Sequence, residues 1–153
     1  MTAPFEIYVN RASVAQLAHH LRLCDQFFVP PLSERVSLMD YSAKLHERAE
    51  RFEAWIETTL VGLVAGYYDA EPDMVAFISS VSVLKEWQGR GVASALVDRS
   101  IAHAQHLGFG VIELEVALQN DLAVRLYRKH GFQVISQDAN QAKMALALRG
   151  DRR

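Results

Sequence analysis

The first residues that could do chemistry are two glycines at the start of a predicted helix. Gly89 and Gly91 flank Arg90 within VLKEWQGRGVASALVD, which runs from Val83 to Asp98. A helix that begins in such a turn leaves its first amide hydrogens unpaired, with the positive end of the helix dipole behind them. The glycines let the backbone curl around a pyrophosphate, and Arg90 adds a charged contact. A plain reversal between a strand and a helix fits the same residues equally well.

Two other phosphate-binding patterns do not match this turn. A dinucleotide-binding fold needs a three-glycine fingerprint, and a nucleotide-triphosphate loop needs Lys followed by Ser or Thr after its last glycine. The turn has neither.

A second group of residues lies downstream, in IELEVALQNDLAVRLYRKHGF. Asn120 and Tyr127 are about two helical turns apart and therefore share a helix face, with Ala123 between them. An amide, a small residue and a phenol in one line form a surface for an extended ligand that contains amides. The alternative is that Asn120 caps the helix and Tyr127 is a core residue with its hydroxyl at the rim.

Glutamates alternate with apolar residues just before that helix. Glu113 and Glu115 oppose Ile112, Leu114 and Val116 in a predicted strand, so their face is either solvated or lines a cleft.

The elements that must position these residues follow from periodicity. FEIYVNRA at 5–12 predicts a strand, and Ser13 with Gln16 forms a capping box before a helix that packs through Val14, Leu17, Ala18 and Leu21. CDQFFVPPLSERVS at 24–37 is an apolar loop, because no helix interior tolerates its Pro-Pro pair. Ser37 caps a second helix, whose apolar stripe is Leu38, Tyr41, Leu45, Ala49 and Phe52.

The second half of the chain predicts strands and two more helices. FEAWIE, LVGLVAGYYD and MVAFISSVSVL are three antiparallel strands, and a long helix follows the glycine turn. FGVIELEV is another strand, Asn120 to His130 another helix that stops at Gly131, and FQVIS and AKMALAL are the last strands. The order βααβββαβαββ predicts an α+β fold of three layers, a mixed central sheet of about seven strands flanked by helices.

Composition limits the classes of function. With 153 residues, 50% of them hydrophobic and 22% charged, the chain is expected to form a single domain over residues 1–150, followed by a short charged tail at 151–153. A formal charge of −2 without a block of like charges disfavours nucleic acid. The single cysteine, Cys24, excludes an internal disulfide and fits the cytoplasm, and neither a secretory leader nor a membrane-spanning segment is expected.

The element order and two motifs resemble the GCN5-related N-acetyltransferase (GNAT) superfamily over nearly the whole chain. The superfamily's coenzyme motif corresponds to Gln88-Gly89-Arg90-Gly91-Val92-Ala93. Its next motif corresponds to Asn120, Ala123, Leu126, Tyr127, Gly131 and Phe132. The two motifs are specific in combination, because they have the expected order and separation.

The resemblance implies an acyltransferase that uses acetyl-coenzyme A (acetyl-CoA) and no metal. The amides of the turn would hold the pyrophosphate, Val81 and Val83 would hydrogen-bond to the pantetheine arm, and Asn120 would contact that arm from the other side. Tyr127 matches the phenol that protonates the departing thiolate, and a backbone amide such as that of Val83 would stabilise the oxyanion. The coenzyme-binding residues implied are Val81, Val83, Gln88, Gly89, Arg90, Gly91, Val92, Ala93, Asn120 and Ala123.

The general base follows from a narrower resemblance. Leu114-Glu115-Val116 followed by Asn120 is similar to the bacterial ribosomal-protein alanine acetyltransferases, which implies that Glu115 takes the proton of the amine. Other members place an acidic residue in the preceding strand, where this chain has Ser79 and Ser80, neither of which is a competent base near neutral pH. Water is the remaining alternative.

The acceptor side is expected beside the first two helices and the loop between them. The candidate substrate residues are Asp25, Arg35, Tyr41, Tyr67 and Ser79. A small-molecule amine such as an amino sugar is favoured over a protein N-terminus or a lysine side chain. A non-catalytic acyl-CoA sensor or structural subunit is the alternative of another class, and a homodimer is expected only by analogy with the family.

Overall fold

The computed structural model describes residues 4–69, 71 and 75–148, so the predicted tail at 151–153 lies outside the described residues. The elements follow in the predicted order βααβββαβαββ. They are β1 (Glu6–Val9), α1 (Val14–Cys24), α2 (Leu38–Arg48), β2 (Glu50–Ile56), β3 (Thr59–Tyr67), β4 (Val75–Val83), α3 (Val92–His106), β5 (Val111–Ala117), α4 (Asp121–Lys129), β6 (Gln133–Gln137) and β7 (Gln141–Ala147).

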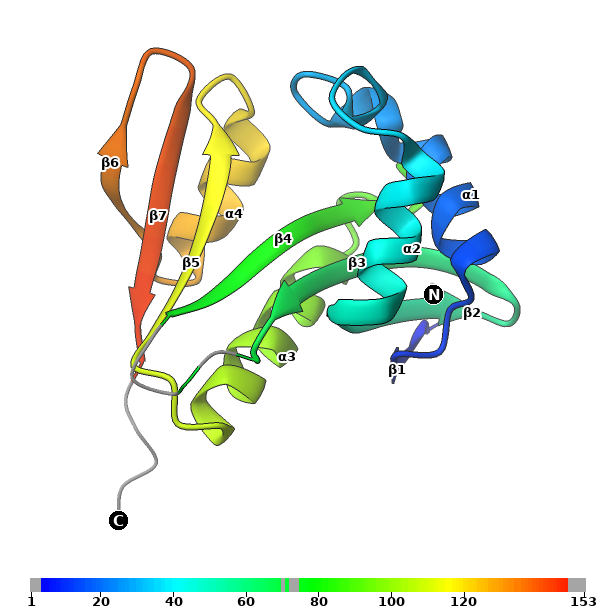
Figure 1. The fold of residues 1–153 in the computed structure, drawn as a ribbon, viewed down its shortest axis with the longest axis horizontal. Helices are drawn as coiled ribbons and strands as arrows, with labels where there is room; N and C mark the ends of the chain where they lie inside the picture. The colour runs from blue at the N-terminus through cyan, green and yellow to red at the C-terminus, as the bar shows by residue number, and fades with distance from the viewer. Residues whose placement is uncertain (1–3, 70, 72–74, 149–153) are drawn as a thin grey trace.

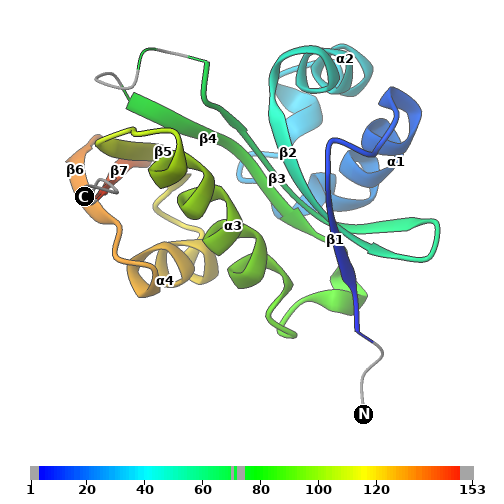
Figure 2. The same cartoon turned by 90° about the horizontal axis from the view of Figure 1, so that it is seen from below.

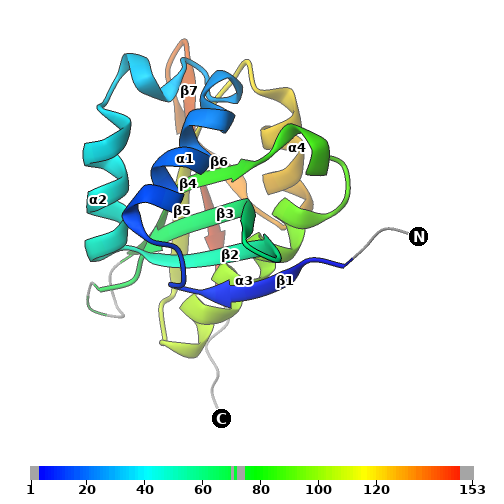
Figure 3. The ribbon, with the colours of Figure 1, turned by 90° about the vertical axis from the view of Figure 1, so that its right-hand side faces the viewer.

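The strands form one mixed seven-stranded sheet in the order β1-β2-β3-β4-β5-β7-β6 (Figure 1). The β4–β5 pair is parallel, and the other neighbouring strands are antiparallel. Helices α1 and α2 cover one face of the sheet, whereas α3 and α4 lie on the other (Figures 2 and 3). The predicted α+β fold of three layers is therefore confirmed. None of the helices in the described part of the chain is long and apolar enough to cross a membrane.

The local sequence explains where the helices begin. Ser13 and Gln16 form the predicted capping box at α1, and the hydroxyl of Ser37 accepts a hydrogen bond from the amide of Asp40 at α2. Gly91, in the left-handed region, is the N-cap of α3 and offers no side chain to its amides. At the end of α4, Gly131 has a φ of +99°, which is the predicted helix stop.

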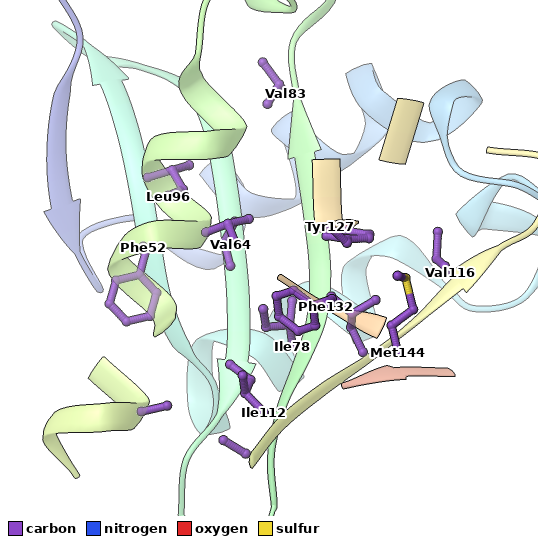
Figure 4. Packing of buried hydrophobic residues seen from close by; sticks show 14 of the residues in the cluster. Phe52, Val64, Ile78, Val83, Leu96, Ile112, Val116, Tyr127, Phe132 and Met144 are labelled. Atoms are coloured by element: carbon purple, nitrogen blue, oxygen red, sulfur yellow. The ribbon is translucent and has the colours of Figure 1, made fainter. Parts of the chain in front are cut away.

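The core consists of two clusters, one on each face of the sheet. The larger cluster lies under α3 and α4, and Figure 4 shows Val64, Ile78, Leu96 and Tyr127 within it. Helix α3 packs closely because Gly62 of β3 has no side chain, and a Cβ there would lie 2.5 Å from Cγ1 of Val92.

The predicted stripe of the second helix is wrong at one residue. Leu45 and Ala49 pack under α1 and α2, but α2 ends at Arg48. Phe52 therefore belongs to β2 and packs on the opposite face, beneath α3. The physical reason is that Ala49 is already extended, with a ψ of 147°, so the helical period does not continue beyond it.

Strands β4 and β5 separate partway along their length. Their pairing ends at Ile78 opposite Leu114, although β4 continues to Val83 and β5 to Ala117. The register of β3 against β4 shifts at the same place, because Ala65 faces Ser80 while Gly66 faces Ile78. Ser79 is therefore the extra residue of a bulge, which bends a strand and increases its twist. Figure 1 shows β4 and β5 diverging toward their C-terminal ends.

Candidate active site

The separation of β4 and β5 opens a cleft of about 820 Å³. Its walls come from the loop after α1, the end of β4, the start of α3, the end of β5, and α4. Of the residues predicted from the sequence, the cleft is lined by Arg35, Tyr41, Ser79, Val81, Val83, Gln88, Gly89, Gly91, Val92, Ala93, Glu115, Asn120, Ala123 and Tyr127. Three predicted residues, Asp25, Tyr67 and Arg90, are not part of its lining.

The glycine turn presents a run of unpaired amides to this cleft. Gly89 and Gly91 have φ values of +78° and +83°, a region that side chains of L-residues rarely adopt. Among the described residues, none accepts a hydrogen bond from the backbone amides of residues 89–94. A Cβ built on either glycine meets no atom within 4 Å, so the space in front of the turn is open. These amides and the dipole of α3 fit a diphosphate.

Gln88 and Arg90 brace the turn rather than point into it. Nε2 of Gln88 donates to the carbonyl of Val83 at 3.1 Å, which ties the turn to the end of β4. The guanidinium of Arg90 stacks on Trp87, 4.9 Å from the ring centroid. In this conformation Arg90 therefore contacts an aromatic ring instead of making the charged contact predicted from the sequence.

The register of β3 and β4 decides which backbone groups face the gap. The amide of Leu84 donates to the carbonyl of Val61, and residues opposite each other in an antiparallel pair alternate between bonded and non-bonded pairs. Val81 and Val83 are therefore in non-bonded pairs, with Val64 and Gly62, and their N–H and C=O groups point away from β3. The C=O of Val83 accepts from Gln88, but with β5 no longer paired beyond Ile78 the N–H and C=O of Val81 and the N–H of Val83 form a strand edge to which an extended amide ligand can bind.

Helix α4 contributes the opposite wall. Asn120 is its N-cap, and Oδ1 accepts from the amide of Ala123 at 3.2 Å. The capping role that the sequence left open is thus real, while Asn120 still lines the cleft with Ala123 and Tyr127. Tyr127 is only 6% exposed and packs edge-on against Phe132. Burial raises the pKa of its phenol, so Tyr127 keeps its proton throughout the neutral range.

The end of β5 forms another wall of the cleft and carries the candidate base. Glu115 lies in β5, is exposed, and is opposite Lys143 of β7 in the register. Glu113, which shares its strand alternation, is half-buried and is not part of the cleft lining. Of the two glutamates on this strand face, only Glu115 lines the cleft.

The wall nearest α2 carries hydroxyl groups. The hydroxyls of Tyr41 and Ser79 lie 3.0 Å apart. Ser80, 4% exposed, lines the cleft with an Oγ that has no partner among the described residues. Arg35, which lies in the loop between α1 and α2, is exposed and makes no ion pair within the described part of the chain. Ser79, Ser80 and Tyr41 are thus potential partners for polar groups of an acceptor.

Asp25 and Tyr67 have other positions. Asp25 fixes the loop, since its carboxylate accepts from the amide and the hydroxyl of Ser33 at 2.7 and 2.6 Å. Tyr67 packs in the cluster beneath α1 and α2, where its hydroxyl is buried and has no partner among the residues that the structure describes. Both residues were predicted to contact the acceptor, but neither side chain lines the cleft.

A buried histidine that the sequence did not single out supports the cleft from behind. Nδ1 of His20 lies 3.0 Å from the carbonyl of Leu60, so this nitrogen donates, and Nε2 accepts from the hydroxyl of Ser82 at 2.9 Å. Ser82 lines the cleft between Val81 and Val83. The available signal was a histidine within the apolar stripe of α1, beside Leu17 and Leu21.

The stability of the protein should therefore fall in mild acid. Burial lowers the pKa of His20 to about 4, below the unfolded value of 6.5. As the pH falls, His20 takes up a proton in the unfolded chain before it does so in the folded protein. The contribution of buried, neutral His20 to the free energy of unfolding is therefore fully present above pH 6.5 and is lost as the pH falls toward 4. Urea unfolding should show that the free energy of unfolding falls by an amount on the order of 3 kcal/mol across this pH interval. In His20→Gln, which lacks the titrating group, this part of the pH dependence should disappear; an unchanged slope would assign it to other groups.

Comparisons with known proteins agree with this geometry. The model of the acetyltransferase (GNAT) family matches residues 14–132. A mycothiol acetyltransferase of Nocardiopsis dassonvillei is 36% identical over 88 residues, which cover 58% of this chain and 26% of that protein. N-alpha-acetyltransferase MAK3 of Arabidopsis thaliana is 31% identical over 116 residues, 74% of this chain and 61% of that protein. The chain thus spans less than two thirds of either relative.

A solved structure extends the likeness to the whole fold. The PaiA N-acetyltransferase of Thermoplasma acidophilum, in complex with coenzyme A, superposes with a TM-score of 0.72 at 16% identity, covering 93% of this chain and 99% of the other. At this identity the likeness concerns the fold alone. The matching family model shows that the chain belongs to the acetyltransferase (GNAT) family, and the divided sheet and the glycine turn agree with this assignment.

Proposed function

We propose that the protein transfers the acetyl group of acetyl-CoA to the primary amine of a small polar acceptor, such as an amino sugar, by direct attack. One observation carries this proposal: the unpaired amides of residues 89–94, the free edge of β4 and a wall of hydroxyl groups meet in one cleft. The first two features fit the diphosphate and the amide-containing arm of the coenzyme. The third fits a hydroxylated amine.

Each cleft residue has a defined task in this proposal. Acetyl-CoA supplies an acetyl thioester that a neutral amine can attack. Glu115 takes the proton from the amine, the amide of Val83 stabilises the negative charge that develops on the carbonyl oxygen, and Tyr127 donates its proton to the departing sulfur. Cys24 takes no part, because it lies outside the cleft lining and burial raises the pKa of its thiol to about 12.

The acceptor wall favours a small polar molecule. Ser79, Ser80 and Tyr41 offer hydroxyl groups, and Ser80 has a buried oxygen that is costly to leave without a partner. A substrate hydroxyl could provide that partner. The proposed setting is the cytoplasm, since the one cysteine is a free, buried thiol.

A peptide N-terminus is the second candidate acceptor. It is favoured by the 31% identity with an N-alpha-acetyltransferase and by the apolar side of the cleft at Phe27, Phe28 and Val29, which could hold the first side chain of a peptide. A panel assay separates the two candidates. Release of free thiol from acetyl-CoA is measured with amino sugars, small amines, peptides with free N-termini and N-blocked peptides that contain lysine. The proposal expects the amino sugars to give the highest kcat/KM; a clear preference for a peptide would replace it.

The role of Glu115 has a test of its own. In Glu115→Gln the acceptor amine loses its base, so kcat/KM should fall by a factor of about 10² and its pH dependence should shift or flatten. Glu113→Gln is the matched control, since it changes the same side chain on the same strand outside the cleft. An unchanged profile in Glu115→Gln would assign proton removal to water.

A further inference from the structure

A chain of three polar side chains connects α3 with the end of α4. Nδ1 of His130 lies 3.0 Å from Oδ1 of Asp98, and its Nε2 lies 3.0 Å from Oγ of Ser94. The imidazole is nearly enclosed, with 7% of the side chain exposed, whereas the carboxylate of Asp98 is 68% exposed. None of these three residues has a task in the proposed transfer reaction.

Ser94 connects this chain to the coenzyme end of the cleft. It lies in the first turn of α3, lines the cleft, and has a backbone amide in the unpaired run of residues 89–94. Its hydroxyl is therefore next to the amides that fit a diphosphate. A hydroxyl at this position helps to bind an anion only if its hydrogen points toward the anion.

The protonation of His130 determines where that hydrogen points. The carboxylate of Asp98 can only accept, so Nδ1 of His130 carries a hydrogen. In the neutral imidazole Nε2 is then bare and accepts the single hydrogen of Ser94, which leaves only lone pairs of Oγ for the cleft. In the imidazolium Nε2 donates to Oγ, and the hydroxyl hydrogen of Ser94 is free to turn toward the cleft.

We propose that His130 is a positioning residue that takes up a proton when coenzyme A binds and thereby turns the hydroxyl of Ser94 toward the diphosphate. The proton comes from solvent and remains on Nε2, and no covalent bond is made or broken. This inference rests on the proposed function, because it requires the diphosphate to bind at the turn. It makes coenzyme binding dependent on pH, with affinity falling as the pH rises and the imidazolium becomes harder to form.

The charged groups around His130 are of both signs. The carboxylate of Asp98 contacts Nδ1 from α3, and a bound diphosphate would add negative charge on the Ser94 side of the ring. Strand β6, which follows, carries no charged residue, and the single charge of β7 lies opposite Glu115. The cations Arg128 and Lys129 directly precede it on α4, whereas Arg90, on the turn, is stacked on Trp87.

Calorimetric titration with coenzyme A tests the proposal directly. Binding is measured at about pH 7.5 in two buffers of different ionisation enthalpy, which gives the number of protons taken up per coenzyme. The wild type should take up more protons than His130→Gln, whose side chain can still donate to Ser94 but cannot titrate. The difference between the two proteins removes the contribution of the coenzyme's own phosphates. Ser94→Ala should bind coenzyme A about ten- to a hundredfold more weakly, the loss typical of a hydrogen bond to a charged group.

Two further variants make the outcome decisive. Asp98→Asn, at an exposed position, should reduce proton uptake without disturbing the fold, and thus replaces His130→Gln if that variant does not fold. His106→Gln, an exposed histidine at the far end of α3, should behave as the wild type. Equal proton uptake in wild type and His130→Gln, or in wild type and Asp98→Asn, would overturn the inference. If the wild type does not bind coenzyme A at all, the proposed function itself fails.

Discussion

Tyr127→Phe should lower kcat by a factor of 10² or more and leave the affinity for coenzyme A nearly unchanged. The expected size is that of a general acid, which typically contributes about 10² to 10⁴ in rate. The phenylalanine ring keeps the packing against Phe132, so the loss should come from the hydroxyl alone. Stopped-flow or steady-state release of thiol gives kcat, and titration with coenzyme A gives the affinity.

The pH dependence adds a second observation for Tyr127. Burial raises the pKa of its phenol, so the acid remains protonated as the pH increases through the neutral and mildly alkaline range. We therefore expect no loss of kcat from this residue up to about pH 10, the ordinary pKa of tyrosine. Tyr41→Phe is the matched control: it removes a cleft phenol that pairs with Ser79, and should raise KM for the acceptor instead. Wild-type turnover in Tyr127→Phe would remove this residue as the acid.

Gly91→Val should weaken coenzyme binding about a hundredfold while the protein still folds. A valine side chain would occupy the open space in front of the turn, and its strained backbone would displace amides that fit the diphosphate. Each lost hydrogen bond to a charged group costs about 1.5 to 3 kcal/mol, or ten- to a hundredfold in affinity. The left-handed backbone also costs a side chain about 1 to 2 kcal/mol of folding free energy.

A second glycine, just beyond the other end of α3, separates the effect on coenzyme binding from the effect of backbone strain. Gly108 follows α3, has a φ of +91°, and lies outside the cleft lining. Gly108→Val should therefore show a similar loss of unfolding free energy in urea and bind coenzyme A as the wild type does. If Gly91→Val binds coenzyme A no worse than Gly108→Val, the turn does not hold the diphosphate, although the fold would stand.

The sequence by itself determined the order of the elements and the turn at which the coenzyme site is proposed. This was possible because the features involved are local. A left-handed turn before a helix requires glycine, so Gly89 and Gly91 identify the turn without any tertiary information. Asn120 and Tyr127 share a helix face by spacing alone, and both line the cleft.

The tertiary structure decided which strand groups and which acceptor residues are available. The bulge at Ser79 sets the register against β3, and a shift by one residue would turn the amides of Val81 and Val83 away from the gap. Tyr41 reaches the cleft while Tyr67 and Asp25 do not, because packing and a hydrogen bond to Ser33 hold the latter two elsewhere.

Two pairs of polar residues could not be predicted from the sequence, because their contacts also depend on the tertiary structure. Ser82 meets His20, and Ser94 meets His130, across long stretches of chain and between different elements. Local backbone requirements leave a mark on neighbouring residues and can be read in a single sequence. Contacts between distant residues depend on strand register and on how helices pack against the sheet, and these emerge only when the whole chain has folded.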